Sequence, residues 1–330
     1  MKRVSLQVIA DSLGVSKGTV SLVLSGKAGN NRVSAELTRK ILNKAKELNY
    51  QPNELARSLR TGHSNTIGLI VADISNVFFG NFVYYIQEHL RKYKYSVITV
   101  NTNESAEQFA EVSNILINRQ VDGIIAVPAD GGAGCMAGIM DRNIPLVQID
   151  RYFPEVSASC VVLDNYSASY RTTERLIAEG CRRICLVKYR KDVSVNTERT
   201  AGFVDAMKAH GLFDDSLIKE VEYSNEEDIR DDISRISCNR EDADALFFTS
   251  HKLFLSGVSA LVRKKVRIPD DIKVACFDKN VAFSLLDFPF IYIEQPVKEM
   301  AEKAVDLLIA HIRGDKEVRK CVFDARICIN

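Results

Sequence analysis

The sequence predicts an all-α N-terminal domain with a helix-turn-helix, followed by a larger α/β body. Apolar residues recur at helical spacing up to about residue 48, and from Thr66 onward apolar strand-like runs alternate with helical stretches. The charge also divides there: residues 1–62 hold eleven Lys and Arg against four Asp and Glu, a net +7 in a chain of net +1, so the remainder carries −6. A chain of 330 residues suits two or three domains.

The first two helices are short and are joined by a glycine-containing turn. Residues 6–13 have apolar positions at i, i+3, i+4 and i+7, and Ser5 is a candidate N-cap. Gly14 interrupts this pattern, and Ser16 can cap the second helix, which gives a helix-turn-helix. The core-facing residues are expected to be Leu6, Ile9, Ala10, Leu13, Val20, Val23 and Leu24.

A third helix is expected after Ser34, ending near Asn49 and before Pro52. Its inward residues are expected to be Leu37, Ile41, Ala45 and Leu48. Three helices of this size form a small bundle, and a bundle with no role in DNA binding stays open as an alternative.

The exposed face of the second helix favours DNA binding, because a helix fits the major groove and its N-terminal residues meet base edges. Small hydroxyl residues can also bond phosphates, helped by the start of the helix. A basic head on an acidic body suggests a polyanion partner, although a solvated basic face would show the same charge. The predicted contacts in this domain are Ser5, Leu6, Ser16, Lys17, Gly18, Thr19, Ser21 and Leu22.

The segment QPNELARSLRTG is helix-permissive but too short to be stable alone. A helix that forms only on DNA, paired across a dimer axis, explains it, and Leu59 could then enter a base step from the minor groove. A plain linker with two leucines is the alternative. The predicted DNA contacts here are Asn53, Ala56, Leu59 and Arg60.

The body contains nine strand-like runs with helical stretches between most of them, which predicts parallel sheets flanked by helices. The runs are almost continuously apolar, which fits sheets covered on both faces. About ten strands could form one large sheet or two smaller ones.

Polar groups follow many of these runs, and ligands bind beyond the carboxyl ends of the strands in open α/β sheets. Charged and amide groups at so many strand ends suit a ligand with several hydroxyls, such as a sugar, and an aromatic ring such as Phe79 can stack on a sugar face. For any one residue a local role is the alternative: Asp164 could cap the next helix. The residues concerned include Asp73, Phe78, Phe79, Pro128, Asp130, Asp150, Arg151, Asp164, Asn165, Ser250, His251, Asp278 and Gln295.

Several function classes are not supported by the sequence. It lacks GxSxG, P-loop and GxGxxG motifs and a metal-binding quartet, so we expect no enzyme, catalytic residue, cofactor or metal. Eight scattered cysteines without a CxxC fit reduced core residues. No signal peptide and no membrane span are evident, so a cytoplasmic location is expected.

The chain resembles the LacI/GalR repressor family along almost its whole length. VSLQVIADSLGVSKGTVSLVLSG is followed by ELNYQPNELARSLRTGHSNTIGLIVADISNVFF, and then VDGIIAVP, PLVQIDR, VVLDN, RTAGF, RIPDDIKVACFD and IEQP occur in order. The resemblance implies a periplasmic-binding-protein-like body with two lobes and three crossing segments. It implies a helix-turn-helix domain at 1–52, a hinge helix and linker at 53–65, and an effector-binding and dimerisation domain at 66–330. Lobe 1 would span 66–163 and 292–320, lobe 2 would span 164–291 and 321–330, and the crossings would fall near 163–165, 291–294 and 321–325.

The resemblance also implies the function: a repressor that binds a near-palindromic operator as a homodimer, under control of a small-molecule effector such as a sugar. A cytoplasmic small-molecule binding protein with a non-regulatory DNA-binding head is the alternative. Arg199, at a helix start in NTERTAGF, is the strongest single candidate. The implied effector contacts are Phe79, Asp150, Arg199, Tyr223, Ser250, Asp278 and Gln295.

Four departures from the family pattern are visible. Leu22 stands where the family usually has Arg, and the loop SGKAGNNRVS is longer than usual, so a different operator is expected. Ser250-His251 replaces an Asn-Asp pair, and Gly180-Cys181 replaces Gly-His. His251 is either a ligand contact or a residue of an exposed loop.

Overall fold

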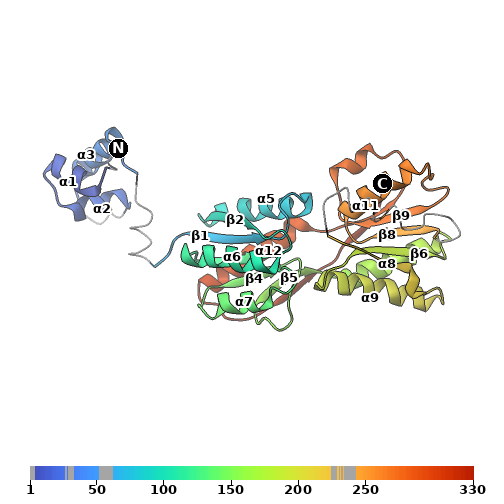
Figure 1. Ribbon diagram of the computed structural model, residues 1–330. Helices are drawn as coiled ribbons and strands as arrows, with labels where there is room; N and C mark the ends of the chain where they lie inside the picture. The colour runs from blue at the N-terminus through green and yellow to red at the C-terminus, as the bar shows by residue number, and fades with distance from the viewer. Residues whose placement is uncertain are drawn as a thin grey trace. The chain divides into compact units, whose positions relative to one another are not determined.

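The computed structural model describes residues 4–26, 28, 33–51, 62–223, 229, 231, 233 and 243–330. It divides into two compact units, residues 1–64 and residues 65–330, which we describe separately (Figure 1). The hinge residues Asn53, Ala56, Leu59 and Arg60 lie outside the described residues.

The N-terminal unit is a bundle of three helices: α1 (Leu6–Leu13), α2 (Lys17–Leu24) and α3 (Ala35–Glu47). Ser5 and Ser16 cap the first two as predicted, and Ser34 caps the third, each side chain accepting a backbone N–H of the first turn. Gly14 ends α1 with φ of 64°, a conformation that glycine adopts without a steric penalty. The buried core residues are Ile9, Ala10, Val20, Val23, Ile41 and Ala45.

The second unit contains two six-stranded sheets in its described part. The first has the order β11-β5-β4-β3-β1-β2 and is parallel throughout; the second has the order β12-β10-β9-β8-β6-β7, with only β12 antiparallel. The first comprises β1 (Thr66–Val71), β2 (Ser96–Asn101), β3 (Gly123–Ala126), β4 (Leu146–Ile149), β5 (Ser159–Leu163) and β11 (Lys320–Phe323). The second comprises β6 (Ile184–Tyr189), β7 (Ile218–Val221), β8 (Ala245–Phe248), β9 (Lys273–Phe277), β10 (Ile291–Glu294) and β12 (Arg326–Ile329).

Helices cover both faces of each sheet, as the apolar strands predict. Because side chains alternate along a strand, Ile67 and Leu69 of β1 pack with α5 (Val77–Lys92) and α12 (Val297–Ile312), whereas Ile70 packs on the face of α6 (Ala106–Asn118) and α7 (Ala133–Met140). In the second lobe, α8 (Asn165–Ala178) and α9 (Ser194–Ala209) lie together, and α11 (His251–Arg263) contacts β8 and β9 (Figure 1). Short 3₁₀ helices occupy Asp215–Leu217 and Val281–Leu285.

Helices α8 and α9 approach each other closely at Gly202. A Cβ atom there would lie 2.2 Å from the carbonyl oxygen of Tyr166 and 3.0 Å from the amide nitrogen of Tyr170. Both are backbone atoms, so no side-chain adjustment could make room. Glycine therefore fixes the packing of α9, the helix that carries Arg199, against α8.

Two of the lobe boundaries expected from the sequence are wrong. Residues 291–294 were expected to cross between lobes, but they form β10, which pairs with β9 and β12 in the second sheet; the crossing follows at residues 295–296. Residues 321–323 were expected in the second lobe, but they belong to β11, which pairs with β5 in the first. In both places the chain completes its hydrogen bonds with the neighbouring strand before it leaves the sheet. Leaving earlier would leave backbone N–H and C=O groups without partners.

Candidate functional site

The predicted DNA-contacting surface of the N-terminal unit centres on α2. Lys17 and Gly18 are exposed, and Ser21 and Leu22 are partly exposed beside the buried Val20. These four form a face free of the unit's own core. The structure therefore leaves this part of α2 available to a partner.

The serines predicted as phosphate contacts also serve the helices themselves. Ser5 Oγ accepts the Val8 amide at 3.4 Å, and Ser16 Oγ accepts the Thr19 amide at 3.1 Å. The hydroxyls of Ser16 and Thr19 lie 2.9 Å apart. Leu6, also predicted to touch DNA, packs against the bundle core.

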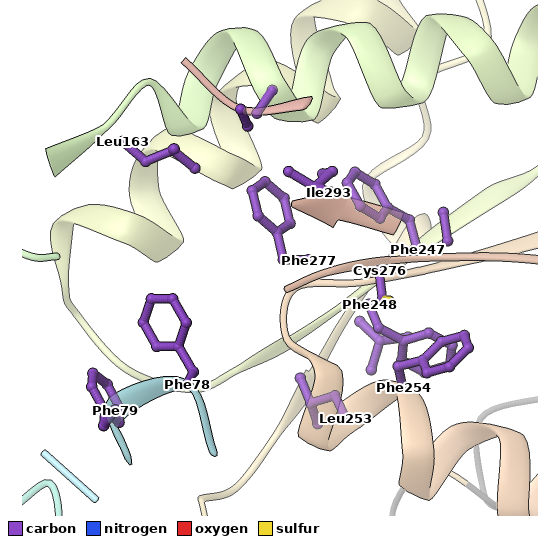
Figure 2. Packing of buried hydrophobic residues seen from close by; sticks show 14 of the residues in the cluster. Phe78, Phe79, Leu163, Phe247, Phe248, Leu253, Phe254, Cys276, Phe277 and Ile293 are labelled. Carbon is purple, nitrogen blue, oxygen red and sulfur yellow. The ribbon is translucent and has the colours of Figure 1, made fainter. Parts of the chain in front are cut away.

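The seven predicted effector residues lie at the carboxyl ends of strands or in the segments that follow them. Asp150, Asp278 and Gln295 come directly after β4, β9 and β10; Ser250 and Tyr223 come two residues after β8 and β7; Phe79 and Arg199 lie on α5 and α9. The contacts described below link both lobes, and we call this region the inter-lobe cleft. Figure 2 shows buried hydrophobic residues packed nearby, with Phe78 and Phe79 of the first lobe close to Phe277 of the second.

In the first lobe, Glu104 and Arg151 form a buried bidentate pair. Arg151 Nη1 and Nη2 donate to the Glu104 carboxylate at 2.6 and 2.8 Å. Burial alone would lower the pKa of Arg151, but the charge and hydrogen bonds of Glu104 raise it above its usual value. The guanidinium lies 5.7 Å from the centre of the Phe79 ring, so this aromatic residue supports the pair at the cleft.

Asp150 is buried and poorly compensated. Its nearest cation is Arg151, whose Nε lies 3.5 Å from Asp150 Oδ2 but whose other nitrogens are committed to Glu104. Burial therefore raises the pKa of Asp150 to about 6. The backbone of Asp150 also has φ of 68°, a left-handed conformation that few residues other than glycine adopt.

Asp278 is equally buried but well compensated. Gln295 Nε2 donates to Asp278 Oδ1 at 2.6 Å, and His251 Nδ1 lies 3.4 Å from Asp278 Oδ2. Burial acts to raise its pKa, but these hydrogen bonds and the charge of Arg199 hold the pKa of Asp278 below its usual value. His251 is thus a buried partner of Asp278 and not part of an exposed loop.

Arg199 is buried without an ion pair among the described residues. Nε donates to Asn165 Oδ1 at 2.8 Å, Nη1 donates to the Thr249 carbonyl at 2.6 Å, and the guanidinium lies 3.8 Å from the centre of the Phe277 ring. Burial lowers the pKa of Arg199, an effect that the more distant Asp278 and Asp150 only partly offset. No described residue accepts a hydrogen bond from Nη2, so the group can still donate to a ligand.

Tyr223 joins the two lobes directly. Its hydroxyl donates to Asp73 Oδ2, and Lys252 Nζ lies 3.7 Å from the same oxygen. The Asp73 carboxylate and burial together raise the pKa of Tyr223 well above its usual value. A second contact between the lobes is a hydrogen bond from Lys191 Nζ to the backbone carbonyl oxygen of Glu104, at 3.4 Å.

Ser250 has a structural duty: it caps α11 by accepting the Leu253 amide at 3.3 Å. Glu104, Lys191 and Lys252 were not among the predicted effector residues. Glu104 follows β2 by three residues, so the strand-end rule extended to that strand would have found it. Lys191 follows β6 by two residues, so the same rule would have found it, whereas Lys252 lies within α11 and carries no signal beyond its charge.

In the part of the chain that the structure describes, we find no cluster of His, Cys, Asp and Glu that could hold a metal. Within the same residues, no helix has the length and hydropathy needed to cross a membrane.

The helix-turn-helix unit and the cleft with its buried charges define the class of protein: a DNA-binding regulator with a ligand-binding body. The chain belongs to the LacI family of bacterial regulatory proteins and is a transcriptional regulator of that family. Residues 5–53 match the family model "Bacterial regulatory proteins, lacI family", and residues 64–318 match "Periplasmic binding proteins and sugar binding domain of LacI family".

Curated relatives span nearly the same length. The chain is 29% identical to an HTH-type transcriptional repressor PurR of Vibrio atlanticus, over 97% of this chain and 95% of the relative. It is 28% identical to a ribose operon repressor of Haemophilus influenzae, over 95% and 93%. The fold is similar to that of the lac repressor dimer bound to operator and an anti-inducer, with a TM-score of 0.86 at 20% identity over 99% of this chain and 98% of the other.

Proposed function

We propose that this regulator is a cytoplasmic repressor that binds a near-palindromic operator as a homodimer and responds to a sugar or sugar derivative bound in the inter-lobe cleft. The observation that carries the proposal is the state of Arg199: a buried guanidinium with an unused nitrogen, between two buried aspartates. This nitrogen can donate to a ligand from a guanidinium that the protein already holds in place.

The operator is contacted by the exposed face of α2. Lys17 provides a charge for the phosphate backbone, and Leu22 provides an apolar contact such as one to a thymine methyl group. An arginine at position 22 could hydrogen-bond to guanine, whereas the Leu22 side chain has no hydrogen-bonding group. The preferred site therefore differs from the usual operator of the family. Two heads of a dimer would contact two half-sites, hence the near-palindrome.

The effector is a polyhydroxy compound. Asp150 and Asp278 offer carboxylate oxygens to hydroxyl groups, Arg199 offers a donor, and Phe79 offers a ring at the cleft. One relative is a ribose operon repressor, and the family model that matches residues 64–318 describes a sugar-binding domain. A purine is the competing ligand class, since another relative is named PurR.

Effector binding shifts the population of lobe arrangements. The bond between Tyr223 and Asp73 and the contact of Lys191 with Glu104 hold the lobes in the arrangement seen here. A ligand that bonds Asp150 and Arg199 together adds to or competes with these contacts. The change in lobe arrangement then either permits or prevents pairing of the two hinge segments on DNA. When they pair, Leu59 would enter a base step from the minor groove.

A thermal-shift screen with sugars, sugar phosphates and purines tests the effector, because a ligand that binds only the folded state raises its apparent stability. We expect a saturable shift with a sugar or sugar derivative and none with purines. A shift with a purine alone would overturn the sugar assignment.

The DNA-binding part is tested by deleting residues 1–62 and by Leu59→Ala. The deletion should abolish specific operator binding, and survival of that binding would contradict the proposal. Leu59→Ala should weaken specific binding while sparing much of the salt-sensitive nonspecific binding. Equal loss of both would exclude the wedge role.

A further inference from the structure

A second cavity lies beside the inter-lobe cleft, between the start of α5 and one flank of α11. We call it the α5–α11 cavity: it is lined by residues 75–77, by His251, Lys252, Leu255, Ser256 and Ser259 of α11, and by Asn280, and its volume is about 300 Å³. A volume of this size holds a small metabolite. Both helices begin at its wall, so the partial positive charges of their N-termini lie close to it.

The asparagine side chains of this cavity have free donors to offer. Asn76 Oδ1 accepts the Phe78 amide at 3.0 Å, and Asn280 Oδ1 accepts the Ala282 amide at 2.9 Å. A backbone N–H can only donate, so these two contacts fix which side-chain atom is oxygen. Among the described residues neither NH₂ group has a partner, so both remain free to donate.

His251 has a free ring nitrogen at this cavity. The residue is 4% exposed, its Nδ1 is held by Asp278, and none of the described residues hydrogen-bonds to its Nε2. A buried imidazole held on one side by a carboxylate is fixed in orientation. When the ring is doubly protonated, Nε2–H becomes a charged donor.

Lys252 adds a charge that its neighbours only partly neutralise. Its nearest carboxylate oxygen, Asp73 Oδ2, is 3.7 Å away and already accepts the Tyr223 hydroxyl, while Asp73 Oδ1 accepts from Ser75. No Asp or Glu is among the residues that line the cavity. The lining is therefore rich in donors and positive in charge.

We propose that the α5–α11 cavity binds a small oxyanion, either free or as the phosphate group of a metabolite. Lys252 and the two asparagine amides donate to its oxygens, and the His251 ring completes the site through an Nε2–H donor. The charged groups around this ring are Lys252 beside it, Asp278 on Nδ1 and, beyond Asp278, Arg199.

This site does not depend on the proposed effector role of the cleft. Among the described residues it meets the cleft where His251 contacts Asp278, where Ser75 and Lys252 contact Asp73, and where Lys252 lies over the Tyr223 ring. The test is therefore made on the full chain without operator and without a cleft ligand, so that failure of either proposal can be told from failure of the other.

The test uses the full chain with isotope-labelled histidine rings, of which there are five. Sodium sulfate, inorganic phosphate and a hexose phosphate are titrated, each against sodium chloride at equal ionic strength. One ring signal, identified by its loss in His251→Asn, should move saturably with an oxyanion and not with chloride. Saturation by phosphate alone indicates a free ion, and saturation only by the hexose phosphate indicates a metabolite.

Lys252→Met should weaken this binding at least tenfold, whereas Lys303→Met, which removes an exposed charge on α12, should leave it unchanged. If His251→Asn fails to fold, these two lysine variants still measure oxyanion binding, because they leave the histidine in place. The proposal is overturned if no oxyanion moves the His251 signal more than chloride does, or if both lysine variants weaken binding equally.

Discussion

The two lobes place an aspartate at corresponding points of their sheets, and the two carboxyls behave oppositely. Asp150 follows β4 with φ of 68°, Asp278 follows β9 with φ of 71°, and both are buried. Burial raises the pKa of Asp150 to about 6, whereas hydrogen bonds from His251 and Gln295 hold the pKa of Asp278 below its usual value. The same backbone geometry therefore supports two electrostatic states.

The difference between the two aspartates arises from the hydrogen bonds of Arg151 in the first lobe and Arg199 in the second. Arg151 is committed to Glu104 and leaves Asp150 short of donors, whereas Arg199 has no ion pair among the described residues. The first lobe lacks a donor at Asp150, and the second has a spare donor at Arg199. A ligand that carries hydroxyl groups supplies what both lobes lack, and the predictions below test this contrast.

Glu104→Gln should have the largest effect, because it leaves the buried Arg151 without its carboxylate. Breaking a buried pair at one partner costs about 3–5 kcal/mol. Chemical denaturation measures the loss. The matched control is Glu317→Gln, whose pair with Arg319 is exposed and should cost less than about 1 kcal/mol. A loss for Glu104→Gln as small as that of the control would show that Arg151 is not committed to Glu104.

Asp150→Asn should stabilise the protein at high pH. A pKa raised from 3.8 to about 6 means that the folded state disfavours the ionised carboxyl, so its stabilising contribution is full below about pH 4 and is lost as the pH rises through 6. The variant should gain up to about 3 kcal/mol at pH 8 and nothing at pH 4, measured by denaturation at both. Asn tolerates positive φ, so backbone strain does not confuse the result.

Asp278→Asn is the mirror-image control. Because the pKa of Asp278 is lowered, its contribution is present above its unfolded pKa and is lost as the pH falls. This variant should lose stability at pH 8. If both substitutions changed stability in the same direction at pH 8, the contrast between the lobes would not hold.

Arg199→Ala should weaken effector binding about 100-fold, equivalent to about 2.7 kcal/mol, while operator binding without effector is kept. Calorimetry with the ligand from the thermal-shift screen, together with operator titrations, measures both. Arg175→Ala, which removes an exposed guanidinium on α8, is the control. A variant that still responded normally to effector would remove Arg199 from the binding site.

Tyr223→Phe should have the smallest effect, a change of about tenfold in effector affinity, because one hydrogen bond to a charged carboxylate contributes about 1.5 kcal/mol at the low end of its range. Tyr166→Phe also removes a Tyr–Asp bond, to Asp205, but within a single lobe. Only the bond between lobes should alter the response to effector. Equal effects of the two variants would show that the Tyr223–Asp73 bond does not influence the lobe arrangement.

The sequence predicted most of what depends on neighbours in the chain. Ser5, Ser16 and Ser34 are capping residues whose signals lie within four residues. The alternation of strands and helices was equally evident. The cleft contacts were less so: Glu104 and Arg151 are 47 residues apart, and nothing in either segment specifies the other. The crossings were misplaced because β10 and β11 are strands of four residues, so a shift of a few residues assigns a whole strand to the wrong lobe.

The crossing at residues 295–296 has a mechanical consequence. Gln295, which bonds Asp278, lies on this crossing, and Asn165, which holds Arg199, follows the first one. Two cleft residues thus sit at the pivot about which the lobes can turn. The six-residue β1 extends roughly 20 Å from its carboxyl end, which precedes Asp73, to Thr66 at its amino end. A small rotation of the lobe at the crossing would therefore become a larger displacement at Thr66, the first residue of β1.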